Sequence, residues 1–339
     1  MTPLVAAKAA APVRLDFAGG WTDVPPFSTR EGGVVVTATI GLFARAEVQA
    51  RADTFRLVAE ELGAELVLPA ADAPVTDARL ALHGAALRLC RPAAQLTLST
   101  RSDVPPGSGL GSSGALDVAL VSALAGAMGE SLEPLACADR AWRLEALELG
   151  LPGGKQDQYS AALGGFNLMF FDDPEVRVTR LALDPDFLSE LARRTVLCYT
   201  GASRLSGNTI ARVVAAYERG EARVVNAFRT MREVALETVE ALQRGDLFLL
   251  STLLERNWLA QQQLDSGMRT SEMALLEHAL KAAGALGGKA AGSGAGGCMF
   301  FIAGDDVAGA RHAATEAGAK VLPVASIWRS EERRVGKEC

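Results

Sequence analysis

The sequence predicts an α+β protein of two lobes, and three observations lead to this prediction. Short apolar runs typical of strands dominate the first half, long helical repeats dominate the second, and two glycine-rich segments each border a predicted strand. The 339 residues are 49% hydrophobic and 22% charged, which is enough apolar material for sizeable cores. We place the lobe boundary within residues 171–185, so that the lobes span residues 1–185 and 186–328.

The first half begins with a predicted strand in which Val13, Leu15 and Phe17 alternate with charged residues, and which ends at two glycines. Further strands are predicted at residues 34–40, 44–50, 66–68 and 96–100. Apolar residues at helical spacing then predict two helices, at residues 116–127 and 135–149.

The second half opens with a strand predicted at residues 194–200. Long helical patterns follow at residues 208–219, 222–244, 247–264 and 271–283. The last predicted elements are a strand at residues 299–303, a helix at 307–317 and a strand at 320–325. Strands grouped before helices in this way are the pattern of an α+β protein.

Composition narrows the function classes. The net charge of -6 and the pI of about 5.3 disfavour a general nucleic-acid binder. Asp117 interrupts the best apolar stretch, and the first residues lack the pattern of a signal peptide, so no membrane anchor is expected. Five scattered cysteines without a CxxC pair indicate reduced thiols. We therefore expect a cytoplasmic protein, monomer or homo-oligomer, whose partners are small molecules rather than nucleic acid or membrane.

The strongest chemical signal is the segment DVPPGSGLGSS at residues 103–113. It follows a predicted strand and opens a predicted helix, and its three glycines let backbone N–H groups approach a ligand closely. A helix N-terminus offers unpaired donors and partial positive charge, which suit a phosphate. The spacing matches neither the Walker A motif nor GxGxxG. The alternative is an ordinary glycine loop with a serine cap.

Two further segments carry candidate chemistry. Asp157 lies beside glycines in GGKQDQY at residues 153–159, where a loop carboxylate can act as a base or hold a cation. Its alternative is a solvated loop residue. The second glycine-rich segment, residues 287–297, precedes an apolar strand and indicates two loops that close on one ligand. The alternative there is a flexible turn.

Three blocks in this order resemble the GHMP small-molecule kinases. They are APVRLDFAGGWTD at residues 11–23, PPGSGLGSS at 105–113 and KAAGSGAGG at 289–297. The resemblance covers the chain from about residue 11 to 328. Within the superfamily, GGWTDVPP and GGKQDQY are most similar to sugar kinases, namely the D-glycero-D-manno-heptose 7-phosphate kinases and the kinase domain of L-fucokinases.

The resemblance implies a fold, a nucleotide and a metal. The N-terminal lobe would resemble ribosomal protein S5 domain 2, the C-terminal lobe would be ferredoxin-like, and ATP and Mg²⁺ would be required. Asp157 would act on the substrate hydroxyl, Arg14 would lie near the reacting phosphoryl group, and Ser113 and Glu145 would bind magnesium. The residues expected to bind ATP are Pro106, Gly107, Ser108, Gly109, Leu110, Gly111, Ser112, Ser113 and Gly294.

Four residues are candidates for the sugar. Asp23 falls where galactokinases place a sugar-binding aspartate, and Trp21 would stack on a sugar face. Lys155 and Arg204 would hold a second phosphate on the substrate. The alternatives are a core tryptophan and structural charges.

These residues predict an ATP-dependent kinase that phosphorylates a sugar or sugar phosphate at the anomeric hydroxyl, on a substrate like D-glycero-D-manno-heptose 7-phosphate. The enzyme alternative is an L-fucokinase-like or other hexose 1-kinase. An alternative from another class is a non-catalytic sensor of sugar and ATP. Intact Asp157, Glu145 and Ser113 disfavour the sensor.

Residues 329–339 continue no pattern of the chain. They read like the translation of a common sequencing-adapter DNA and carry seven charges in eleven residues. We interpret this segment as a non-native, adapter-derived tail without regular structure.

Overall fold

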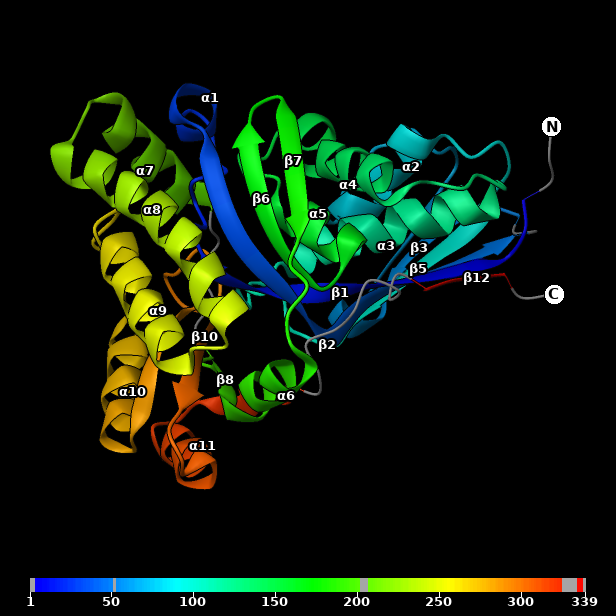
Figure 1. Ribbon diagram of the computed structural model, residues 1–339. Coiled ribbons are helices and arrows are strands. Elements are labelled where there is room, and N and C mark those ends of the chain that lie inside the picture. Colours follow the sequence, from blue (N-terminus) through cyan, green and yellow to red (C-terminus); the bar gives the residue numbers. More distant parts are fainter. Residues whose placement is uncertain (1–3, 51–52, 202–206, 325–333, 338–339) are drawn as a thin grey trace.

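The computed structural model describes residues 4–50, 53–201, 207–324 and 334–337, and its strands form two separate sheets (Figure 1). The first sheet has the order β12-β1-β2-β5-β3-β4, with β6 also paired to β2 and β7 to β6; every pair is antiparallel except β3 with β5. Its strands are β1 (Ala7–Ala18), β2 (Gly33–Ala50), β3 (Phe55–Ala59), β4 (Ala64–Leu68), β5 (Leu96–Ser102), β6 (Phe166–Asp172), β7 (Glu175–Arg180) and β12 (Arg334–Lys337).

Strand β2 corrects one prediction, because it is continuous where two strands were expected. Its first part pairs with β6 and its second part with β5, while β1 pairs with both parts. The expected gap is a bulge, where the register shifts between Pro12 and Val13. Proline has no N–H for the ladder, so a bulge is a favourable place for it.

The helices of the first lobe pack around α3 (Ser112–Ala127), which lies between the sheet and α4 and α5. Because α3 is buried on nearly all sides, its sequence is apolar all round. The predicted helix at 135–149 is α4 followed by a π-helical turn. The remaining bounds are α1 (Phe27–Glu31), α2 (Ala81–Cys90), α4 (Pro134–Arg143), the π turn (Leu144–Glu148) and α5 (Gln156–Leu163). The sequence patterns missed α2, α5, β3 and the β6–β7 hairpin.

The second sheet has the order β11-β8-β10-β9 and is antiparallel throughout. In chain order this is 4-1-3-2 with helices after the first and third strands, which is the ferredoxin-like arrangement. Its strands are β8 (Thr195–Tyr199), β9 (Ala285–Ala290), β10 (Cys298–Ala303) and β11 (Lys320–Leu322). The helices are α6 (Pro185–Arg194), α7 (Gly207–Glu218), α8 (Ala222–Arg244), α9 (Leu247–Gln262), α10 (Ser271–Ala282) and α11 (Val307–Glu316). The α+β class and the helices predicted in this half are confirmed.

The two lobes share one apolar core at the end of β1. The rings of Phe17 on β1 and Phe300 on β10 lie 5.2 Å apart between centroids. Beside them, Lys289 on β9 donates to the Asp16 backbone carbonyl at 2.6 Å and to its carboxylate at 3.0 Å, and both side chains are buried. Lys289 was expected in a glycine loop, but the loop begins only after β9.

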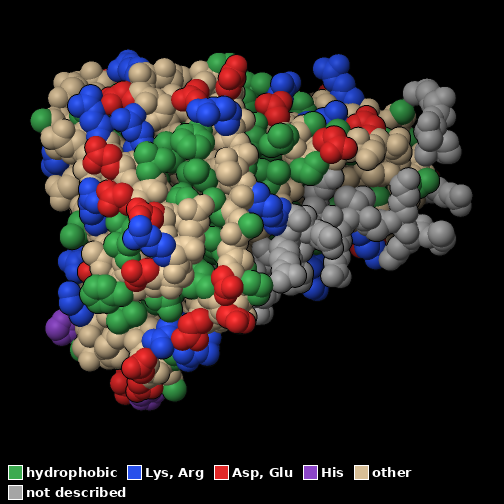
Figure 2. All heavy atoms as spheres, viewed as in Figure 1, with side chains coloured by type: hydrophobic (Ala, Val, Ile, Leu, Met, Phe, Trp, Pro, Cys, Tyr) green, Lys and Arg blue, Asp and Glu red, His purple; other side chains and the backbone are tan. Residues whose placement is uncertain are grey.

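The expected unstructured tail contains a strand, and the surface charges of the molecule are mixed. Residues 334–337 of the expected unstructured tail form β12, which pairs with β1 at residues 7–10 and so corrects that expectation. Acidic and basic side chains are interspersed over the face formed by α7 to α9 (Figure 2). Among the described residues, no helix is long and apolar enough to cross a membrane.

Candidate active site

The first glycine-rich turn connects β5 to the N-terminus of α3. Gly107, Gly109 and Gly111 have φ of +70°, +74° and +68°, which other residues adopt only at a cost. Within the part of the chain that the structure describes, no side chain caps α3 and its first turn has no acidic residue. The unpaired N–H groups and the positive end of the helix dipole therefore favour an anion such as a phosphate.

The second glycine-rich loop, residues 291–297, packs directly against this turn. The N–H of Cys298 donates to the carbonyl of Ser108 at 2.7 Å. A Cβ built on Gly292 would overlap the carbonyl oxygen of Gly109. The predicted meeting of the two glycine-rich segments is confirmed. A Cβ built on Gly294 would lie 3.1 Å from Met268 Sδ, so Gly294 packs closely against Met268.

Arg14 joins both loops to Asp157. Its Nε and Nη2 lie 2.9 and 2.8 Å from Asp157 Oδ1, and its Nη1 donates to the carbonyls of Gly109 at 2.7 Å and Ala291 at 2.9 Å. Asp157 is in the first turn of α5, not in the loop that the sequence predicted. Arg14 is buried, whereas 27% of the Asp157 side chain is exposed, so the carboxylate can reach a ligand.

A chain of polar contacts lies behind this pair. Ser113 hydrogen-bonds the Glu145 carboxylate, whose pKa is raised by burial and by the nearby charge of Asp157. The Gln158 amide donates to Glu145 at 2.9 Å and to Asp117 at 3.1 Å. Burial holds the pKa of Asp117 well above its usual range. Asp117 was not among the predicted site residues, although an acidic residue in an otherwise apolar helix indicates a polar contact in the core.

The donor set of this chain fits magnesium. A serine hydroxyl and a carboxylate are the hard oxygen ligands that Mg²⁺ takes together with phosphates. In the described ranges, no three His, Cys, Asp or Glu side chains are placed to hold a metal by themselves. An ion held by Ser113 and Glu145 would therefore depend on phosphate oxygens as well.

Asp23 lies under the turn that leads into α5. Its carboxylate accepts from the backbone N–H of Gln156 at 3.0 Å and from the Gln156 amide at 3.1 Å. Burial, with repulsion from Asp157 and Asp16, raises the pKa of Asp23 to about 7. Asp23 thus contacts Gln156, the residue that precedes Asp157 in the chain.

Two predicted substrate contacts need correction, and a third lies outside the described residues. Trp21 is 4% exposed, packs among apolar side chains and donates its indole N–H to the Ser293 carbonyl, so it has no free face for a sugar. Lys155 forms an ion pair with Asp173 at 2.6 Å and is therefore not a free phosphate ligand. Arg204 lies outside the residues that the structure describes.

Two parts of the chain match models of one protein family. The models of the GHMP kinases N terminal domain and of the GHMP kinases C terminal match residues 79–165 and 238–320. A D-glycero-alpha-D-manno-heptose 7-phosphate kinase from Campylobacter jejuni is 30% identical over 301 residues, covering 86% of this chain and 87% of that protein. An L-fucokinase/L-fucose-1-P guanylyltransferase from Bacteroides fragilis is 29% identical over 337 residues, covering 89% of this chain and 35% of that protein.

A solved structure extends the likeness to the whole fold. The crystal structure of a D-glycero-D-manno-heptose 1-phosphate kinase from Bacteroides thetaiotaomicron has a TM-score of 0.79 and 25% identity, and the match covers 97% of both chains. The two family models fall one in each lobe, and the likeness to the Campylobacter enzyme runs over most of both proteins. The chain therefore belongs to the GHMP kinases and is an ATP-dependent phosphotransferase.

Proposed function

We propose that this kinase transfers the γ-phosphoryl group of ATP to a sugar or sugar phosphate, at the anomeric hydroxyl. One observation carries the proposal. The Arg14–Asp157 pair lies where the two glycine-rich loops meet, with the uncapped N-terminus of α3 beside it. A phosphate-binding helix end, a carboxylate and a fixed guanidinium are the groups that phosphoryl transfer to a hydroxyl uses.

Each part of the proposed reaction is assigned to particular residues of this chain. The α3 N-terminus and the first glycine-rich turn hold the phosphates of the nucleotide. Asp157 accepts the proton of the attacking sugar hydroxyl, and Arg14 orients that carboxylate while adding positive charge near the transferred group. Ser113 and Glu145 would hold a magnesium ion, which supplies charge neutralisation at the phosphates when bound.

The relatives supply the substrate part of the proposal. The name of the Campylobacter protein specifies D-glycero-alpha-D-manno-heptose 7-phosphate, whose anomeric hydroxyl is free, whereas the name of the Bacteroides thetaiotaomicron protein specifies the 1-phosphate, whose anomeric hydroxyl is not. We therefore propose a heptose 7-phosphate or a similar sugar phosphate as the substrate. The alternative, a hexose 1-kinase of the fucokinase kind, is supported by the likeness to the Bacteroides fragilis protein. A non-catalytic sensor is disfavoured by the intact Arg14–Asp157 pair.

A screen for ADP release tests the proposal. The purified protein is given ATP and Mg²⁺ with D-glycero-D-manno-heptose, its 7-phosphate, its 1-phosphate, L-fucose, D-mannose and D-galactose in turn. We expect the heptose 7-phosphate to give the highest kcat/KM. Asp157→Asn should abolish most turnover, whereas Asp305→Asn, a matched change at a fully exposed carboxylate, should not. Sugar binding without ADP release by the wild type would favour the sensor instead.

A further inference from the structure

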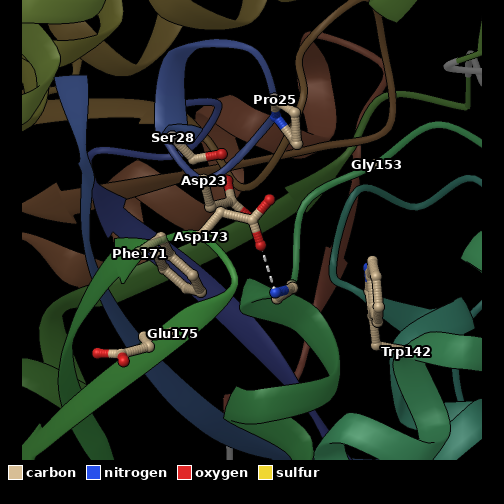
Figure 3. A pocket seen from close by; sticks show the side chains of 9 residues that line it. Asp23, Pro25, Ser28, Trp142, Gly153, Phe171, Asp173 and Glu175 are labelled. Atoms are coloured by element: carbon tan, nitrogen blue, oxygen red, sulfur yellow. Dashed lines mark hydrogen bonds and ion pairs between the residues drawn. The ribbon is translucent and has the colours of Figure 1, made fainter. Parts of the chain in front are cut away.

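A small pocket lies beside Asp23 (Figure 3). Its walls come from α1 and the turn before it, from α4, from the turn before α5 and from the β6–β7 hairpin. The cavity volume is about 20 Å³. That is room for about one water molecule or one hydroxyl group, and it is too small for a phosphate.

Lys155 forms one wall of this pocket, and its ammonium group is already engaged. It donates to Asp173 at 2.6 Å, the contact drawn at Asp173 in Figure 3, and to the Pro174 carbonyl at 3.1 Å. The same ammonium lies 4.8 Å from the centre of the Trp142 ring. A substrate phosphate would have to displace Asp173, so Lys155 shapes the pocket without offering it a free charge.

The remaining polar groups suit a neutral hydroxyl. Among the described residues, Ser28 Oγ has no hydrogen-bond partner although Ser28 is 98% buried, and Figure 3 shows it directed toward Asp23 and Asp173. An unpaired buried hydroxyl costs free energy until a ligand or water pairs with it. The side-chain oxygens of Asp23 and Asp173 can accept a hydrogen bond from a hydroxyl, and the Lys155 ammonium is already paired with Asp173, so the pocket offers a phosphate no free positive charge.

We infer that this pocket is the subsite for one unphosphorylated hydroxyl of the sugar, paired with Ser28 and Asp23, and that a phosphate on the substrate lies outside it. The inference rests on the proposed sugar-kinase function and refines it. It reassigns Lys155 from a phosphate ligand to a wall residue that positions Asp173, and it makes Ser28 a determinant of sugar specificity.

Variants at Ser28 and deoxy sugars test the subsite together. Ser28→Ala removes only the hydroxyl, and Ser28→Val also fills the cavity. With the sugar that the wild type turns over fastest, we expect KM to rise about tenfold in Ser28→Val and less in Ser28→Ala, with kcat and ATP affinity little changed. One monodeoxy analogue of that sugar, lacking the inserted hydroxyl, should lose affinity for the wild type but not for Ser28→Val.

Lys155→Met separates the two roles of Lys155. If Lys155 is a wall residue, kcat/KM falls by the same factor for the free sugar and its phosphate ester. A selective loss for the phosphate ester would overturn the inference, as would a Ser28→Val enzyme with unchanged KM for every analogue. If the wild type releases no ADP with any sugar, the proposed function fails on its own. Calorimetric binding of the heptose 7-phosphate then tests the subsite, and equal affinity for wild type and Ser28→Val, or no binding to either, overturns it.

Discussion

The two glycine-rich loops have similar sequences but use their glycines differently. In the first loop, a Cβ built on Gly109 would make only ordinary contacts, 3.8 Å from the backbone N of Cys298 and 3.9 Å from that of Gly292. In the second loop, a Cβ on Gly292 would overlap the Gly109 carbonyl, and one on Gly297 would lie 2.7 Å from the Ser108 carbonyl. At Gly109, glycine therefore serves the φ of +74°, whereas at Gly292 and Gly297 it lets two backbones pack closely.

The largest expected effect comes from Asp157, the carboxylate that Arg14 links to both loops. Asp157→Asn keeps the shape and an acceptor for Arg14 but removes the charge and the proton acceptor. We expect kcat to fall by about 10²–10⁴-fold while the Kd for ATP changes little. ADP release under saturating substrate measures the first quantity and calorimetry the second. An unchanged kcat would mean that the loops position ATP without Asp157 as the base.

The strand that leads into the second loop provides the next test. Lys289→Met leaves the buried Asp16 carboxylate without its ion pair, and we expect the free energy of unfolding to fall by about 3–5 kcal/mol. Urea denaturation measures it. The matched control is Arg256→Met, which breaks an exposed pair with Glu237 and should cost less than about 1 kcal/mol. Equal losses would show that the buried pair does not fasten the lobes.

The pH dependence of protein stability tests the environment of Asp23, on the proposed sugar side of the site. Its pKa is raised to about 7 in the folded protein from 3.8, so the folded state holds this proton where the unfolded state has lost it. Its ionisation therefore lowers stability as pH rises from about 4 to 7. Asp23→Asn should remove this penalty and stabilise the protein by up to about 4 kcal/mol at pH 8, with little change at pH 4. Melting temperatures of wild type and variant across this range would reveal the opposite trend if Asp23 were stabilised as an anion.

A pair of glycine variants measures the difference between the loops directly. Gly292→Ala should destabilise the protein by about 1–3 kcal/mol, because the methyl group presses on the Gly109 carbonyl and Arg14. Gly109→Asn places a residue that tolerates positive φ where a Cβ makes only ordinary contacts, so it should alter stability less than Gly292→Ala but weaken ATP binding. Thermal unfolding and ATP titration of both variants should give opposite rankings. Identical rankings would mean that the glycines of the two loops do not have different roles.

The smallest effect is expected far from both loops. We propose that residues 329–339 are a non-native tail, although residues 334–337 pair with the edge of β1. A four-residue edge strand adds little to a sheet that is already wide, so its removal should leave the melting temperature and kcat unchanged within error. Truncation after residue 328 with the same assays checks this. A clear loss of stability would identify the tail as native structure.

Local sequence patterns were sufficient to predict the elements whose conformation depends mainly on nearby residues of the chain. Apolar spacing predicted α3 and helices α7 to α11 but not α6, and the first glycine-rich turn was predicted because positive φ and a helix start depend on adjacent residues. The motif resemblance also singled out Arg14, Asp157 and Asp23, which the structure places close together. In each case the information lies within a few residues of sequence.

The pairing of the polar groups depends on contacts between distant parts of the chain. Arg14 meets Asp157 and Ala291, residues 143 and 277 positions away, and no local pattern encodes such contacts. The same holds for Lys155, whose charge is neutralised by Asp173, and for Trp21, whose ring is covered by other apolar side chains. The donors, acceptors and charges that the chain carries can be read from its amino-acid sequence alone. Packing determined which of them are buried, paired or left for a ligand, because desolvation and ion pairing depend on distances between segments that only the fold brings together.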